Sequence, residues 1–182
     1  MPILQRVIHT SADFDYIQNL TFSENAVEKA LDALRNGADI ITDTNMALSG
    51  INKKSLHALG GEAHCFMSDP DVAAEAKRRG ITRAMVSMEK AARLSSDNLI
   101  FAIGNAPTAL IQLEQLIREH QLAPKLIIGV PVGFVNVVEA KELILQSGVP
   151  CIVARGNKGG SNIAAAICNA LLYQLYLSLI HI

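Results

Sequence analysis

The feature that most constrains the fold is a regular alternation between short apolar runs and longer segments with helical periodicity. The short runs are rich in β-branched residues and are bounded by polar or glycine-containing turns, a pattern typical of buried strands. Five of them predict strands, at 39–42, 63–67, 99–103, 126–130 and 151–154.

The segments between these runs have the spacing of amphipathic helices. In 24–36, apolar residues recur at helical intervals and Gly37 follows directly, where a glycine commonly ends a helix. The other predicted helices are 70–79, 83–94, 107–120, 137–146 and 161–175. The strands are continuously apolar rather than alternating, so both faces of their sheet must be covered. We therefore predict an α/β fold: one doubly wound domain over residues 1–182, with a mostly parallel sheet and helices on both faces.

Composition and charge exclude several classes of protein. With 50% hydrophobic and 18% charged residues, the chain can bury a sizeable core and is not disordered. The formal net charge is -1 and no basic run exceeds Lys77-Arg78-Arg79, so we expect no nucleic-acid partner. The three cysteines lie in apolar runs without CxxC spacing, which predicts reduced thiols, no disulfide and no zinc site.

The two ends of the chain bear on its location. The first residues, MPILQRVIHT, contain one basic residue and too short an apolar run for a signal peptide, so we expect a cytoplasmic protein. Residues 163–182 are apolar enough to raise the question of a membrane span, which needs roughly 20 such residues. However, Gln174, Ser178 and His181 would form a polar stripe on one helix face. We therefore expect no membrane partner, and a helix that packs on the core or on a protein partner.

Ligands of doubly wound sheets bind beyond the carboxyl ends of the strands, so the loops that leave the strands are the candidate sites. One such loop, Asn105-Ala106-Pro107-Thr108, opens a predicted helix. Its simplest interpretation is ordinary helix-start chemistry. Alternatively, its free N–H groups and its Asn and Thr side chains face a ligand carboxylate.

A second loop, 155–161, has two adjacent glycines, two nearby cations and a helix N-terminus. It lacks the GxxxxGK[ST] order, and no GxGxxG follows any strand, so a nucleotide is disfavoured. Glycines that let backbone approach a ligand, together with cations, suit carboxylates. A plain strand-to-helix turn is the alternative.

Among the five histidines, His9 is the one without an evident structural role. It lies where a short apolar run gives way to small polar residues, and no HExxH motif or His/Cys cluster accompanies it, so we expect no metal. No GxSxG elbow or activated cysteine indicates a nucleophile. Asp13 and Asp15 are either paired carboxylates or turn-capping groups.

Several motifs in one order resemble the precorrin-8X methylmutase family, including its cobalt-precorrin-8 branch. They are RVIHTSADFDY, DTNMALSGI, GITRAMVSME, IGNAPTAL, GVPVGFVNVVEAKE and RGNKGGSNIAAAICNALL, and they cover about Arg6 to Gln174. The resemblance implies an isomerase of cobalamin biosynthesis that moves a methyl group from carbon 11 to carbon 12 of a corrinoid tetrapyrrole, without a cofactor. It implies that His9 is the catalytic acid, that Arg83 lies in the pocket, and that the protein is a homodimer.

A methyl shift within one conjugated ring needs no external donor, which agrees with the missing nucleotide and metal motifs. It does need a proton on a ring nitrogen, and an imidazole can donate and recover one near neutral pH. The reaction also needs groups that bind and orient a polycarboxylate substrate, namely backbone N–H groups, helix N-termini and arginine side chains. The expected substrate-binding residues are Arg83, Asn105, Thr108, Gly160 and Ser161, with Thr10, Ser11, Asp43, Asn45, Met46, Gly133 and Phe134 as further candidates.

The sequence departs from the family at both ends. Family members usually begin well upstream of the histidine, whereas eight residues precede His9 here. Residues 176–182 match nothing in the family, so we interpret them as a non-native tail without function. Two other functions are open: a non-catalytic tetrapyrrole carrier, and a nucleotide-dependent reductase or methyltransferase, which would need a glycine fingerprint after the first strand.

Overall fold

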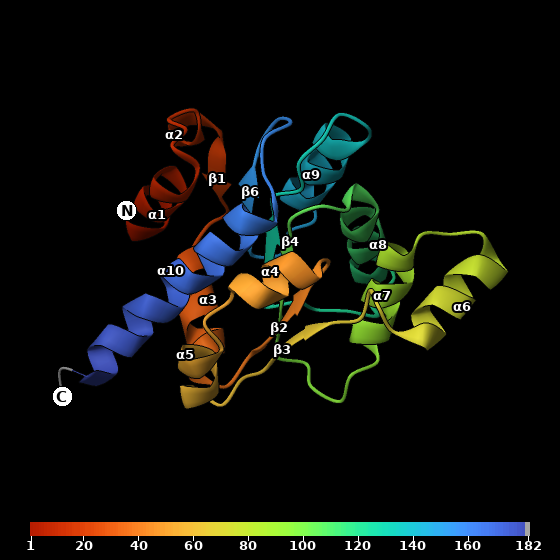
Figure 1. Cartoon of the computed structure of the whole chain (residues 1–182), viewed down its shortest axis with the longest axis horizontal. Coiled ribbons are helices and arrows are strands. Elements are labelled where there is room, and N and C mark those ends of the chain that lie inside the picture. The colour runs from red at the N-terminus through yellow and green to blue at the C-terminus, as the bar shows by residue number, and fades with distance from the viewer. Residues whose placement is uncertain (181–182) are drawn as a thin grey trace.

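The computed structural model describes residues 1–180 and has one six-stranded sheet with helices on both faces (Figure 1). The strand order is β1-β6-β5-β4-β2-β3. β2 to β6 pair in parallel, and β1 pairs with β6 in antiparallel fashion, with Leu20 opposite Ala154. The predicted fold, with its mostly parallel sheet, is confirmed. The strands are β1 (Leu20–Phe22), β2 (Asp39–Thr42), β3 (Ala63–Cys65), β4 (Leu99–Ile103), β5 (Leu126–Gly129) and β6 (Cys151–Ala154).

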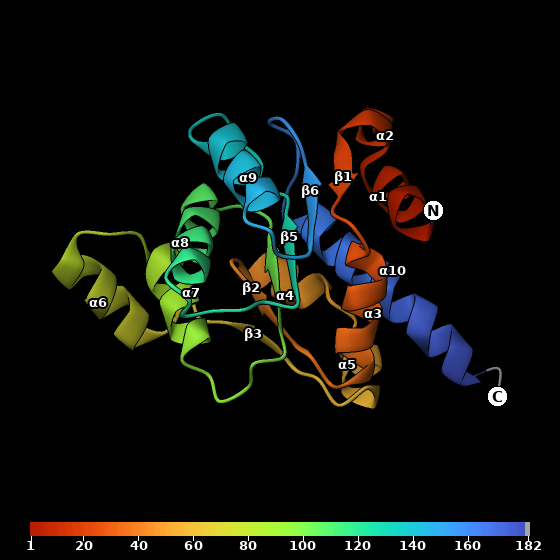
Figure 2. The ribbon, with the colours of Figure 1, turned by 180° about the vertical axis from the view of Figure 1, so that it is seen from behind.

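The helices form a layer on each face of the sheet, as the front and back views show (Figures 1 and 2). They are α1 (Pro2–Ser11), α2 (Tyr16–Asn19), α3 (Ala26–Arg35), α4 (Asn45–Gly50), α5 (Lys53–Ala58), α6 (Pro70–Arg79), α7 (Arg83–Ala92), α8 (Pro107–Arg118), α9 (Val137–Gln146) and α10 (Ser161–Ile180). Alternate residues of the central strands supply the two cores. Ile100 and Ile128 join the core under α1, α3 and α10, whereas Phe101 and Ile127 join the core under α7, α8 and α9.

The strand order places a topological switch between β2 and β4. The chain passes from β2 to β3 on one side, then returns to β4 on the other side of β2. Without β1, this is the order of flavodoxin-like sheets, in which the switch point is where ligands bind. The turns after β2 and β4 are therefore the expected place for a site.

The N-terminal region differs most from the sequence-based expectation. Residues 2–11 form a helix, with Pro2 in its first turn and Ile3 and Val7 buried one turn apart, whereas we predicted no helix there. β1 was also not predicted, because three residues are too few to show a strand pattern. β3 is half-buried rather than fully covered, because it is an edge strand.

At the other end, α10 continues five residues beyond the predicted boundary of Leu175. Within residues 1–180, no helix combines the length and apolarity that crossing a bilayer requires. The end of the proposed tail, 181–182, lies outside the described residues.

Candidate active site

The turns after β2 and β4 are joined by one buried carboxylate. Asp43, which is 1% exposed, accepts backbone hydrogen bonds from Gly104 (2.8 Å), Asn105 (2.8 Å) and Ala106 (2.6 Å). Burial raises the pKa of this carboxyl, and the three N–H donors oppose that rise. Asp43 thus holds the 104–106 turn in place and is too enclosed to contact a ligand, contrary to the role we predicted for it.

The same geometry changes the interpretation of the Asn105–Thr108 turn. One of the two interpretations left open from the sequence required its N–H groups to be free for a ligand carboxylate, but Asp43 already accepts those of residues 104–106. The Asn105 side chain is exposed. The hydroxyl of Thr108 lies 2.9 Å from that of Thr82, the N-cap of α7, and the two form a hydrogen bond. This contact places Thr108 beside the helix start that carries Arg83.

Arg83 is the first residue of α7, and its side chain is exposed. Among residues 1–180, no carboxylate lies within ion-pair distance of its guanidinium. Other arginines of the chain, such as Arg79 and Arg155, form bidentate pairs with glutamates. Arg83 is therefore available to bind a substrate carboxylate.

The start of α10 packs tightly against the same region. The Ser161 hydroxyl lies 2.7 Å from that of Thr44, which also caps α4 by accepting the N–H of Ala47. Gly104 faces this contact: a Cβ there would lie 2.6 Å from the Cα of Ser161. Only a glycine lets the 104 turn approach α10 so closely.

The loop before α10 is anchored to the end of β5. Gly160 has φ +138° and donates its N–H to the Val130 carbonyl at 2.9 Å. Gly133 and Asn157 form a reciprocal pair, in which the Asn157 amide donates to the Gly133 carbonyl at 2.8 Å. The loops after β2, β4, β5 and β6 thus meet at one edge of the sheet, and we call 43–46, 104–108, 131–136 and 155–162 the crest loops.

Three predicted site residues present side chains to solvent on these loops. Phe134 is 91% exposed and Met46 is 70% exposed, an unusual position for large apolar groups. Asn45 donates to the Ser68 hydroxyl at 2.9 Å. Exposed apolar side chains at the mouth of a site suit a large, flat, apolar ring.

His9, Thr10 and Ser11 do not lie on the crest loops but in the last turns of α1. The imidazole of His9 and the side chain of Thr10 are exposed. Ser11 donates to the Val7 carbonyl at 2.8 Å and accepts from the N–H of Asp13, so it caps the helix end. Within the described residues, no hydrogen bond links these three side chains directly to the crest loops.

An indirect connection runs through Lys158. Its ammonium lies 2.6 Å from a carboxylate oxygen of both Asp13 and Asp15, just after α1. These hydrogen bonds raise the pKa of Lys158 and lower that of Asp13. The turn that follows His9 is thereby held against the loop that carries Gly160.

This pairing corrects our view of the 155–161 loop. We expected Arg155 and Lys158 to serve a ligand, but Arg155 forms a bidentate pair with Glu142 and Lys158 binds the two aspartates. A different lysine, Lys141, supports the loop from within α9 and was not predicted. Its position inside an amphipathic helix gave no signal, because lysine is rarely buried.

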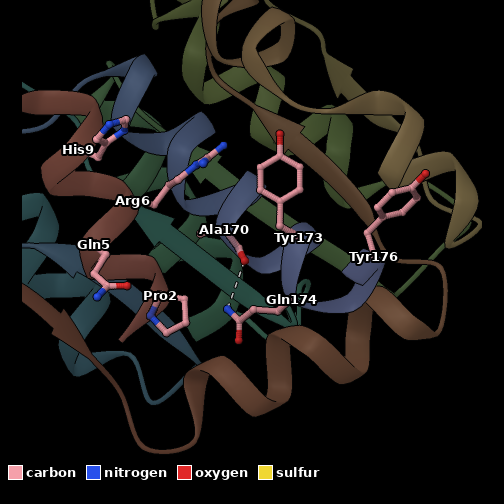
Figure 3. A pocket seen from close by; sticks show the side chains of 8 residues that line it. All are labelled: Pro2, Gln5, Arg6, His9, Ala170, Tyr173, Gln174 and Tyr176. Carbon is pink, nitrogen blue, oxygen red and sulfur yellow. Dashed lines mark hydrogen bonds between the residues drawn. The ribbon is translucent and has the colours of Figure 1, made fainter. Parts of the chain in front are cut away.

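His9 lines a groove of about 650 Å³ between α1 and α10 (Figure 3). Arg6, one turn before His9, places its guanidinium 4.7 Å from the centre of the Tyr173 ring. Tyr176, which we assigned to a functionless tail, also lines this groove. An i, i+3 pair such as Arg6 and His9 shares a helix face, so recognising the helix in the sequence would have indicated Arg6.

The chain is similar in sequence and in structure to known proteins of one family. Residues 1–174 match the family described as precorrin-8X methylmutase. The chain is 51% identical to the cobalt-precorrin-8 methylmutase of Salmonella typhimurium, over 95% of this chain and 80% of the relative. It is 46% identical to that of Priestia megaterium, over 93% of this chain and 75% of the relative. The crystal structure of a precorrin-8X methylmutase from Thermus thermophilus superposes with a TM-score of 0.87 at 37% identity, covering 97% of this chain and 86% of that one. With this agreement in sequence and in fold, the chain belongs to the precorrin-8X methylmutase family.

Proposed function

We propose that this chain moves a methyl group from carbon 11 to carbon 12 of precorrin-8X or cobalt-precorrin-8. As a member of its family, the chain is an isomerase of cobalamin biosynthesis. The observation that carries the proposal is the family match over residues 1–174, which includes the segment around His9.

We propose His9 as the proton donor. A proton on a ring nitrogen makes the receiving carbon electron-poor, so that the methyl group can migrate without any external carrier. The exposed imidazole lines the α1–α10 groove. A donor must be within hydrogen-bond reach of the atom it protonates, and an exposed histidine beside a groove can meet that condition.

The crest loops would hold the substrate. A tetrapyrrole with several carboxylates needs charged and N–H donors around its edge and apolar contacts on its face. Arg83 offers an exposed guanidinium beside these loops, and Asn105 offers an exposed amide. Phe134 and Met46 offer apolar surface.

Two forms of the substrate are open, with and without cobalt. The relatives of Salmonella and Priestia are both named cobalt-precorrin-8 methylmutase and are more similar in sequence than the Thermus protein, named for precorrin-8X. We therefore propose the cobalt form as the preferred substrate. In that case the metal arrives within the substrate.

Turnover tests the proposal and separates an isomerase from a carrier. The purified chain is incubated with each form of the substrate while the visible spectrum is followed. We expect conversion by the unmutated chain, and loss of conversion in His9→Ala with product affinity within about tenfold, because an acid contributes mainly to the transition state. The control is His57→Ala, an exposed histidine of α5. Binding without turnover in the unmutated chain would favour the carrier, and full activity of His9→Ala would exclude the acid role.

We also propose that the working protein is one cytoplasmic domain that forms a homodimer. Its support is the family resemblance together with the exposed apolar side chain of Val135, next to the proposed substrate site, which a second copy would cover. Light scattering at micromolar concentration is expected to give the dimer mass. A stable, active monomer would refute the dimer.

A further inference from the structure

Lys141 of α9 is fully buried, yet no acidic partner of its side chain lies among the described residues. Its ammonium donates to the Gly156 carbonyl at 2.6 Å and to the Lys158 carbonyl at 2.9 Å. Among the described residues, no carboxylate lies within 4.0 Å of it. Burying a cation on neutral acceptors alone is costly, and burial lowers the pKa of this lysine to about 8. An arrangement that costs stability calls for a functional reason.

The two carbonyls that Lys141 holds fix the direction of the neighbouring N–H groups. In a trans peptide the C=O and the following N–H point in opposite directions, and the described residues contain no cis peptide. With the carbonyls of residues 156 and 158 turned toward Lys141, the N–H groups of Asn157 and Gly159 point away from it. Neither N–H has a hydrogen-bond acceptor within residues 1–180.

Of the three cations in and beside this loop, Lys141 is the one whose charge is not neutralised by a carboxylate of the described residues. Lys158 is neutralised by Asp13 and Asp15, and Arg155 by Glu142. Lys141 acts through the two peptide groups: its charge polarises each carbonyl, which makes the opposite N–H a stronger donor. Backbone N–H groups of a turn that face the same side can form an anion site, and those of Asn157 and Gly159 both face away from Lys141.

We propose that Lys141 is a positioning residue, which orients the N–H groups of Asn157 and Gly159 to bind one carboxylate side chain of the tetrapyrrole. This inference rests on the proposed function, because that function supplies the polycarboxylate ligand. It adds a carboxylate subsite made of backbone, supported by a buried cation that never touches the substrate.

The test compares Lys141→Met with the unmutated chain by calorimetric titration of two ligands: the corrin polycarboxylate product, and the same corrin with its carboxylates converted to amides. We expect Lys141→Met to weaken binding of the polycarboxylate about tenfold or more, and binding of the amide less than about twofold. The KM is expected to rise more than kcat falls. Lys54→Met, at an exposed lysine of α5, is the control for the substitution itself.

A purely structural role would weaken both ligands equally, so an unchanged preference for the polycarboxylate overturns the inference. If Lys141→Met does not fold, the inference is tested by comparing the affinities of Asn157→Pro and Asn157→Ala for the polycarboxylate. Both lose the side-chain contact with Gly133, but only proline removes the N–H. Equal affinity of these two variants for the polycarboxylate would also overturn the inference. If the unmutated chain neither converts nor binds its substrate, the proposed function fails, and this inference with it.

Discussion

The hydroxyl of Thr44 lies 2.7 Å from the hydroxyl of Ser161, which joins the turn after β2 to the first residue of α10 across 117 positions of sequence. Thr44 also caps α4 through the N–H of Ala47 at 3.0 Å. One side chain therefore fixes the start of a helix and the contact between two crest loops.

Removing the two hydroxyls is expected to give non-additive losses of stability. Thr44→Val should cost about 1–2 kcal/mol, since it removes a helix cap and a hydrogen bond, and Ser161→Ala about 0.5–1.5 kcal/mol. The double variant should lose about 0.5–1 kcal/mol less than the sum, because both single changes break the same bond. Urea unfolding measures all three, with Ser49→Ala, an exposed position of α4, as the control. Strict additivity would show that the contact contributes nothing.

Gly104→Ala is expected to destabilise the protein by about 1–3 kcal/mol and to reduce product affinity, because the new methyl group would meet backbone atoms of α10. Backbone cannot move aside as a flexible side chain can. The matched control is Gly129→Ala in β5, where the nearest atoms, all side-chain, are at least 3.4 Å away. Thermal unfolding compares the two, and equal effects would contradict the close approach.

Arg83→Ala is expected to weaken product binding by about tenfold or more while leaving thermal stability nearly unchanged. The guanidinium is exposed and, among the described residues, has no acidic partner whose loss could affect folding. Arg35→Ala, an exposed arginine of α3, serves as the comparison. Calorimetric titration measures the affinity, and unchanged binding would remove Arg83 from the site.

The stability contributed by Lys141 is expected to depend on pH. Burial lowers its pKa from 10.5 to about 8, so between these values the unfolded chain holds a proton that the folded chain lacks. The free energy of unfolding should therefore rise with pH in this window, by up to about 1.4 kcal/mol per pH unit, and stay level below it. Urea unfolding between pH 7 and 10 measures the free energy of unfolding of the unmutated chain and of Lys141→Met. The contributions of the other titrating groups cancel in the difference between the two. A difference independent of pH would contradict the lowered pKa.

The sheet was predictable because its strands carry a strong local signal. Runs such as Asp39–Thr42 and Leu99–Ile103 are apolar on both faces, and the structure starts and ends these strands at the predicted residues. β1 and α1 gave weaker signals. A three-residue strand has no period to detect, and the polar residues of α1 obscure the two buried positions, Ile3 and Val7.

The candidate site was less predictable, because its contacts are long-range. The sequence shows that Asp43 follows a strand, but not that its carboxylate meets N–H groups 61 or more residues away. Similarly, nothing near Lys158 indicates that two aspartates before α2 neutralise it. Local patterns locate loops that carry groups able to bind or react. Tertiary pairing then decides which of these groups remain free to contact a ligand.

The pairing of β1 with β6 and the packing of α1 against α10 have a consequence for synthesis on the ribosome. The residues around His9 are synthesised before β6 and α10, the strand and the helix against which β1 and α1 pack. Domains commonly begin to fold as the chain emerges. Here β2, β4 and β5 are complete before β6 and α10 are made, so α1 and β1 wait undocked until those two elements have emerged.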